Sequence, residues 1–208
     1  MATDFLLNAL ATLFVTLDPI GLAPIFIALT AGMTAQQRRS TGIRAVIISA
    51  VVLAAFALVG ERLLGVLGIS LHAFRIAGGI MLFWIGFEMV FDKREVRKSE
   101  TANRALHEEQ LRDVAAVPLA VPLMAGPGAI TATILLAGTP KEDLWVLPAV
   151  LGIIALVLLS CLAIFLLADR IDRLLGHTGR TVLTRLLGVV LTALAIQFVA
   201  DGILALAA

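Results

Sequence analysis

Asp18 is the only ionisable residue near the centre of a long apolar stretch of this sequence. An unpaired carboxylate at the centre of a membrane costs at least about 2.5–3.5 kcal/mol, so something must compensate for its charge. Three compensations fit: the carboxylate caps free backbone N–H groups, it is protonated, or it faces a cation such as a substrate ammonium or a coupling ion. Capping alone is a structural role, and it is compatible with a part in transport.

Two prolines, Pro19 and Pro127, each lie near the middle of an apolar stretch. A proline inside a helix removes a backbone hydrogen bond, but proline is favoured at the first position of a new helix, after an Asp or Gly cap. Both stretches therefore predict a helix that stops and restarts, which brings two N-termini with free N–H groups to the membrane midplane. Such a place suits a carboxylate. The alternative is two proline kinks that only shape the bundle.

These features define the candidates for a solute site. We expect the backbone amides after Gly126 and Asp18 to hold a carboxylate, and the Asp18 side chain to take an ammonium or a coupling proton. Thr131 and Gln197 add uncharged hydrogen-bonding capacity, although such groups more often bond within a helical bundle. The candidate substrate-binding residues are Asp18, Pro19, Gly21, Gly126, Pro127, Gly128, Thr131 and Gln197.

The composition places these residues in a membrane protein. Of the 208 residues 60% are hydrophobic and only 15% are charged, against about 25% charged in soluble domains. The net charge of +1 excludes a basic nucleic-acid binder and an acidic disordered chain. Long apolar runs without the alternating polarity of barrel strands predict an all-α protein with six transmembrane spans. The spans are Phe5 to Leu29, Thr41 to Gly60, Leu71 to Phe91, Val114 to Pro140, Leu144 to Ala168 and Leu183 to Leu206.

The positions of Lys and Arg predict the orientation. Six spans put both termini on one side, and the loops after the first, third and fifth spans carry 13 of the 16 Lys and Arg residues. By the positive-inside rule those loops are cytoplasmic, so both termini face the outer side of the membrane. The stretch 92–113 holds six acidic and six basic residues. We expect it to be a helical cytoplasmic linker, solvated rather than a binding arm.

The two halves of the chain resemble each other. Residues 61–78 match residues 172–188 at seven identities and one exchange of Glu for Asp. Residues 1–91 and 114–208 each hold three spans, so the second half is predicted to be inverted relative to the first. Inverted repeats, here with broken first and fourth helices, are typical of secondary transporters. The alternative is chance recurrence of leucine and glycine.

Other classes of protein find little support in the sequence. Cys161 is the only cysteine, so no intrachain disulfide or cysteine metal cluster is expected. The spans hold no Ser/His pair and no cluster of metal ligands, so we predict no enzyme activity, no metal and no cofactor. The expected partners are the lipid bilayer and a small solute, with a coupling proton or sodium ion, and no nucleic acid. Homo-oligomerisation stays open.

Three motifs with a distinctive spacing carry a resemblance that covers essentially the whole chain. They are Asp18-Pro19-Ile20-Gly21-x-x-Pro24-Ile25-Phe26, Arg75-Ile76-Ala77-Gly78-Gly79 and Pro122-Leu123-x-Ala125-Gly126-Pro127-Gly128-Ala129-Ile130. With them the sequence resembles the MarC family of six-span bacterial inner-membrane proteins, also catalogued as uncharacterised membrane proteins and grouped with LysE-type exporters. Some members are described as neutral amino acid transporters. The resemblance implies a transporter or exporter of a small solute such as a neutral amino acid; the alternative is a non-transporting membrane scaffold or partner subunit.

Overall fold

The computed structural model describes residues 2–107, 113–138 and 144–207, and in these ranges its regular elements are all helical. This confirms the all-α prediction. Five helical stretches are long and apolar enough to cross a membrane, or six if the bent pair η1 and α6 is one span. The elements are α1 (Ala2–Leu17), α2 (Pro19–Leu29), α3 (Ala35–Val66), α4 (Leu71–Val90), α5 (Lys93–His107), η1 (Ala115–Met124), α6 (Pro127–Ala137), α7 (Val146–Leu166) and α8 (Ala168–Ala207).

Large apolar side chains cover the outside of the bundle. Val51, Val189 and Leu204 are 65%, 58% and 70% exposed, and they lie on α3 and α8. Apolar surface spread over whole helices would be an aggregation hazard in water. In a bilayer the same surface faces lipid tails, so the exposed side chains fit a multi-pass membrane protein.

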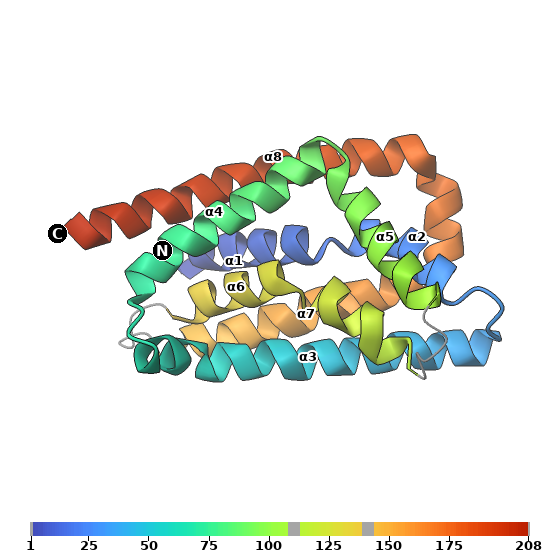
Figure 1. The fold of residues 1–208 in the computed structure, drawn as a ribbon, viewed down its shortest axis with the longest axis horizontal. Helices are drawn as coiled ribbons and strands as arrows, with labels where there is room; N and C mark the ends of the chain where they lie inside the picture. The colour runs from blue at the N-terminus through green and yellow to red at the C-terminus, as the bar shows by residue number, and fades with distance from the viewer. Residues whose placement is uncertain (1, 108–112, 139–143, 208) are drawn as a thin grey trace.

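Helices α4 and α8 lie side by side and run in opposite directions, with both chain termini at the same end of the molecule (Figure 1). Small residues permit this close packing: a Cβ added at Gly86 would lie 2.9 Å from the carbonyl oxygen of Gly188, and one added at Gly188 would lie 2.9 Å from that of Gly86. In membranes such small residues let backbones approach. Helix α8 changes direction at Gly176, whose φ of +57° favours glycine.

The broken stretch formed by α1 and α2 is the centre of the bundle. Of its most apolar window 67% is buried, against 22% to 39% for the other four long helices. It contacts α6, α7 and α8, and its side chains Leu13, Leu17 and Leu22 are almost completely buried. Phe26 stacks on Phe165 of α7 with ring centroids 4.4 Å apart. Among these five helical stretches, the least lipid-exposed is therefore the one that carries Asp18.

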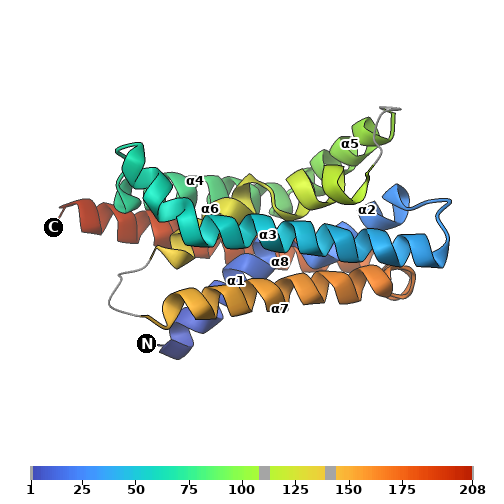
Figure 2. The ribbon, with the colours of Figure 1, turned by 90° about the horizontal axis from the view of Figure 1, so that it is seen from below.

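Helix α5 corrects one expectation from the sequence. Arg94, Lys98 and Ala102 are only 5%, 7% and 2% exposed, and their spacing of four places them on one face of the helix. This face packs onto the bundle, where α5 contacts α2, α4 and η1, while the C-terminal end of α5 projects from the bundle (Figure 2). The prediction of a solvated connector is therefore wrong for this face of α5, while Lys93, Val96 and Glu100 are exposed. Residues 108–112 of the predicted linker lie outside the described ranges.

Candidate functional site

The first helix break lies at Asp18. The left-handed backbone of Asp18, with φ of 56°, ends α1, and Pro19 begins α2. Its Oδ1 accepts a hydrogen bond of 3.0 Å from the backbone N–H of Gly21. A Cβ added at Gly21 would overlap this carboxylate, because it would lie 2.8 Å from Asp18 Cγ. The capping hypothesis for Asp18 is therefore confirmed, and Gly21 makes room for the cap.

The carboxylate of Asp18 also has a cationic partner within the chain. Lys98 of α5 donates from Nζ to Asp18 Oδ2 over 3.1 Å, and both side chains are buried. Burial lowers the pKa of Lys98 from its ordinary 10.5 to about 8, while the charge of Asp18 opposes this shift. Lys98 thus occupies the position that we expected a substrate ammonium or a coupling ion to take.

The second helix break lies at Gly126, between η1 and α6, whose axes differ by 57°. In η1 the backbones of Val117 and Val121 are extended, as expected for residues that precede prolines. Gly126 is the N-cap of α6, and no side chain of the described residues caps this end. The N–H groups of Gly128 and Ala129 therefore lack the partners that an N-cap side chain would supply.

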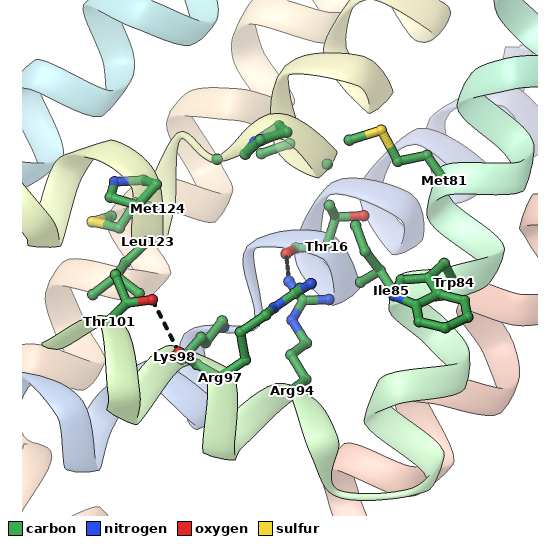
Figure 3. A pocket seen from close by; sticks show the side chains of 15 residues that line it. Thr16, Met81, Trp84, Ile85, Arg94, Arg97, Lys98, Thr101, Leu123 and Met124 are labelled. Carbon is green, nitrogen blue, oxygen red and sulfur yellow. Dashed lines mark hydrogen bonds between the residues drawn. The ribbon is translucent and has the colours of Figure 1, made fainter. Parts of the chain in front are cut away.

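A cavity of about 260 Å³ opens beside this second break. Figure 3 shows side chains from α5 on one side of it, Trp84 and Ile85 of α4 on another, and Leu123 and Met124 of η1 opposite. It is lined by Thr16, Met81, Trp84, Ile85, Arg94, Arg97, Lys98, Thr101, Pro122, Leu123, Met124, Gly126, Pro127, Gly128 and Ala129. Basic side chains and the backbone at the start of α6 therefore line one cavity, together with mostly apolar side chains.

Arg94 is the most deeply buried arginine of this cavity. One terminal nitrogen donates to the backbone carbonyl of Thr16 and the other lies 3.3 Å from the sulfur of Met89, while Nε has no hydrogen-bond partner among the described residues. Burial lowers the pKa of Arg94, and the charge of Asp18 partly opposes this effect. Arg94 thus reaches from α5 to the end of α1 (Figure 3).

Arg97, by contrast, has a carboxylate partner. Its terminal nitrogen lies 2.8 Å from Oε2 of Glu88, and Glu88 also accepts a hydrogen bond of 3.1 Å from the indole of Trp84. Within the described ranges no group of three His, Cys, Asp or Glu side chains is arranged to hold a metal ion. The chemistry that this site offers is the binding of a negatively charged group.

The structure brings some of the predicted site residues together. Gly126, Pro127 and Gly128 line the cavity, while Asp18, Pro19 and Gly21 form the first break beside it. Two others lie elsewhere. The Thr131 hydroxyl is 3.8 Å from the sulfur of Met81 but does not line the cavity. Gln197 lies on the exposed face of α8, where it donates to Asp201 over 2.7 Å, so the structure does not bring it to this site.

Sequence reasoning missed the cations of α5. Two signals pointed to them: Asp18 required a compensating charge, and Arg94 and Lys98 are spaced by four residues, with the small Ala102 one turn further along. Neither signal alone identifies which of the many Lys and Arg residues reaches Asp18.

Comparisons with known proteins agree with this picture of a membrane bundle. Residues 3–207 match the family described as MarC family integral membrane protein. The chain is 39% identical to the UPF0056 membrane protein YhcE of Escherichia coli strain K12, over 92% of this chain and 88% of that protein. It is 37% identical to a UPF0056 membrane protein of Methanocaldococcus jannaschii, over 98% of both chains, and 32% identical to the UPF0056 membrane protein YvbG of Bacillus subtilis, over 98% of this chain and 96% of the other. No solved structure is a significant match to this chain. On these similarities, which span nearly its whole length, the chain belongs to the MarC family of integral membrane proteins.

Proposed function

We propose that this chain is a membrane transporter that carries a small carboxylate-bearing solute, such as a neutral amino acid, by secondary transport or export. The observation that carries the proposal is the cavity beside the uncapped N-terminus of α6. Its volume of about 260 Å³ lies just below the range of about 300–1,000 Å³ of ligand pockets in general, so it suits a solute of amino acid size.

The position of the cavity also supports transport. Irregular backbone at membrane depth is tolerated only where protein shields it or where it lines a watery cavity, and in known transporters such breaks form the solute site. Here the break at Gly126 lines the cavity directly, and the break at Asp18 adjoins it through Lys98. Both interrupted helices therefore contribute to one place.

The proposed arrangement includes two inverted three-helix repeats, residues 1–91 and 114–208. Two features support it: each repeat begins with a stretch that restarts at a proline, and α4 and α8, the last helices of the two repeats, pack antiparallel. A solved structure in which the halves superpose through a two-fold axis in the membrane plane would bear this out. If the two halves superpose but no such axis relates them, the inverted arrangement is contradicted.

We further propose that the protein lies in the bacterial inner membrane with both termini outside. The excess of Lys and Arg in three loops supports this orientation, and the termini lie at one end of the bundle (Figure 1). A reporter enzyme active only in the periplasm, fused after Ala208, should be active. If a reporter that is active only in the cytoplasm is active at the same position, the orientation is the opposite of the proposed one.

Flux in proteoliposomes tests the transport proposal. Purified protein should carry labelled leucine or alanine across the membrane under an imposed proton or sodium gradient, above the rate of protein-free liposomes, and an ionophore that collapses the gradient should abolish the net accumulation. If no amino acid moves under either gradient, the amino acid assignment fails.

Cysteine accessibility distinguishes the transporter from a non-transporting scaffold or partner subunit. After Cys161→Ala, single cysteines replace Met81, Thr101 or Leu123 of the cavity wall, and Leu13 of the core serves as the buried control. A transporter requires a solute-accessible cavity, so the wall positions should react with a membrane-impermeant thiol reagent from at least one side. A scaffold predicts wall positions as unreactive as Leu13.

A further inference from the structure

The charges around the cavity do not balance. Three cations, Arg94, Arg97 and Lys98, face two carboxylates, those of Asp18 and Glu88. Lys98 is paired with Asp18 over 3.1 Å and Arg97 with Glu88 over 2.8 Å. Among the described residues no carboxylate pairs with Arg94, which is only 5% exposed. One positive charge is therefore in excess, and it is the most deeply buried arginine that lacks an anion.

A buried guanidinium without an anionic partner is unfavourable, because it has lost water and gained little in exchange. Arginine stays charged, and its planar fork of N–H donors matches a carboxylate. The carbonyl of Thr16 and the sulfur of Met89 satisfy only part of this fork, since Nε keeps no partner. An anion in the cavity would complete the coordination of Arg94.

The N-terminus of α6 lines the same cavity as Arg94. The backbones of Gly128 and Ala129 line it, and no side chain of the described residues caps this helix. Free N–H groups and the positive end of the helix dipole both favour an anion there. Two independent features, the Arg94 side chain from α5 and the N-terminus of α6, thus both favour a negatively charged ligand.

We infer that the cavity recognises its solute by a carboxylate held between Arg94 and the N-terminus of α6, and that the amine of an amino acid contributes little to binding. Both carboxylates near the cavity already pair with cations, so neither is left as an unpaired negative charge for a substrate ammonium. Trp84, Ile85, Leu123 and Met124 offer apolar contact for a hydrocarbon chain. The class of ligand is therefore a small aliphatic carboxylate, with or without an amine; that this ligand is a transported solute rests on the proposed function.

Binding of three matched ligands to the detergent-solubilised protein tests this inference. Leucine has both charged groups, 4-methylpentanoate lacks the amine, and 3-methylbutylamine lacks the carboxylate. Trp84 lines the cavity, so its fluorescence in a Trp145→Phe background reports occupancy. We expect 4-methylpentanoate to bind at least as tightly as leucine, and 3-methylbutylamine not to bind up to about 10 mM. Equal binding of the amine, or no binding of either carboxylate in this range, overturns the inference.

Variants of α5 locate the site. Arg94→Gln should weaken binding of 4-methylpentanoate at least about tenfold, because a charge-assisted hydrogen bond is lost. Lys93→Gln makes the same change at an exposed position one residue away, and it should leave the affinity unchanged. Unchanged affinity in folded Arg94→Gln contradicts the inference. If Arg94→Gln does not fold, the ligand series in the protein with Arg94 intact still decides it.

Inorganic phosphate separates a carboxylate site from a general anion site. Phosphate should displace 4-methylpentanoate only weakly, and binding tighter than that of the carboxylate would overturn the assignment. Different outcomes contradict the transport proposal and the anion site. Carboxylate binding without flux in proteoliposomes contradicts transport and leaves the anion site in place, whereas flux without Arg94-dependent binding contradicts the anion site alone.

Discussion

The two helix breaks begin in the same way but differ in how their polar groups are satisfied. At both, a proline opens a new helix, α2 at Pro19 and α6 at Pro127. At the first break the Asp18 side chain caps α2 and Lys98 pairs with its charge. At the second, Gly126 supplies no cap and the free amides face a cavity. At the first break the Asp18 carboxylate finds its partners within the chain, while at the second break N–H donors are left for a ligand.

The comparison teaches that an ionisable residue in a membrane span is not by itself the ligand site. Asp18 is completely buried, does not line the cavity and makes both of its contacts inside the protein. The break without an ionisable residue of its own instead adjoins Arg94, which α5 supplies from elsewhere in the chain. We therefore expect substitutions at the first break to affect stability and those at the second to affect binding.

The largest effect is expected from separating Asp18 from Lys98. Asp18→Asn leaves the Lys98 charge buried without a partner and should lower the free energy of unfolding by about 3–5 kcal/mol. Chemical unfolding in detergent measures it. The double variant Asp18→Asn/Lys98→Met removes both charges and should be more stable than Asp18→Asn alone. Additive effects of the two substitutions would mean that the pair is not coupled.

Transport by the same double variant sharpens the comparison. If the first break is only structural, folded Asp18→Asn/Lys98→Met should keep most of the wild-type flux, because Arg94 and the α6 amides are unchanged. Loss of flux from this variant in its folded form would give the Asp18–Lys98 pair a direct part in transport.

The pH dependence of stability is the second effect in size. The pKa of Lys98 is about 8 in the folded protein and about 10.4 in an unfolded chain, so the unfolded chain binds more protons between these values. Stability should therefore rise with pH across this window, by up to about 3 kcal/mol in total. Unfolding curves from pH 7 to 10 measure the rise relative to Asp18→Asn/Lys98→Met, which should lack it. An identical pH dependence in both proteins would assign the rise to other groups.

Steric crowding of the cap should have a smaller effect. In Gly21→Ala the new methyl group would overlap the Asp18 carboxylate, and we expect a loss of about 1–3 kcal/mol in the free energy of unfolding. Gly65→Ala is the matched control, because no atom lies within 4 Å of its added Cβ. It should be neutral or more stable by up to about 1 kcal/mol. Equal stability of the two variants would show that the cap tolerates displacement.

The smallest change in stability is expected at the second break. In Gly128→Ala the methyl group would meet Cδ1 of Ile85, a flexible side-chain end, so the loss should be about 1 kcal/mol. The displaced Ile85 enters the cavity, and affinity for 4-methylpentanoate should fall more than stability does. Ile85→Val removes Cδ1, so the double variant should regain affinity. No recovery in the double variant would place the ligand elsewhere.

The sequence by itself determined the membrane class, the approximate positions of the apolar spans and the positions of both breaks. These properties depend on short-range chemistry: apolar runs of bilayer length, a proline at the first helical position, and an Asp that caps the third residue after it. For this reason the cap from Asp18 to Gly21 could be predicted from residues three apart.

The tertiary structure alone decided which charges meet. Lys98 pairs with Asp18 across 80 positions, and Arg94 reaches Thr16 across 78, because one face of α5 is buried against the bundle. The high charge of the stretch 92–113 gives no sign of this burial. Packing also decided that Gln197 faces outward on α8, since a helix in a membrane can rotate any side toward lipid without a change in its sequence. The local sequence pattern predicts where a helix begins and ends. The long-range contacts of α5 decide which of the two breaks keeps N–H donors for a ligand.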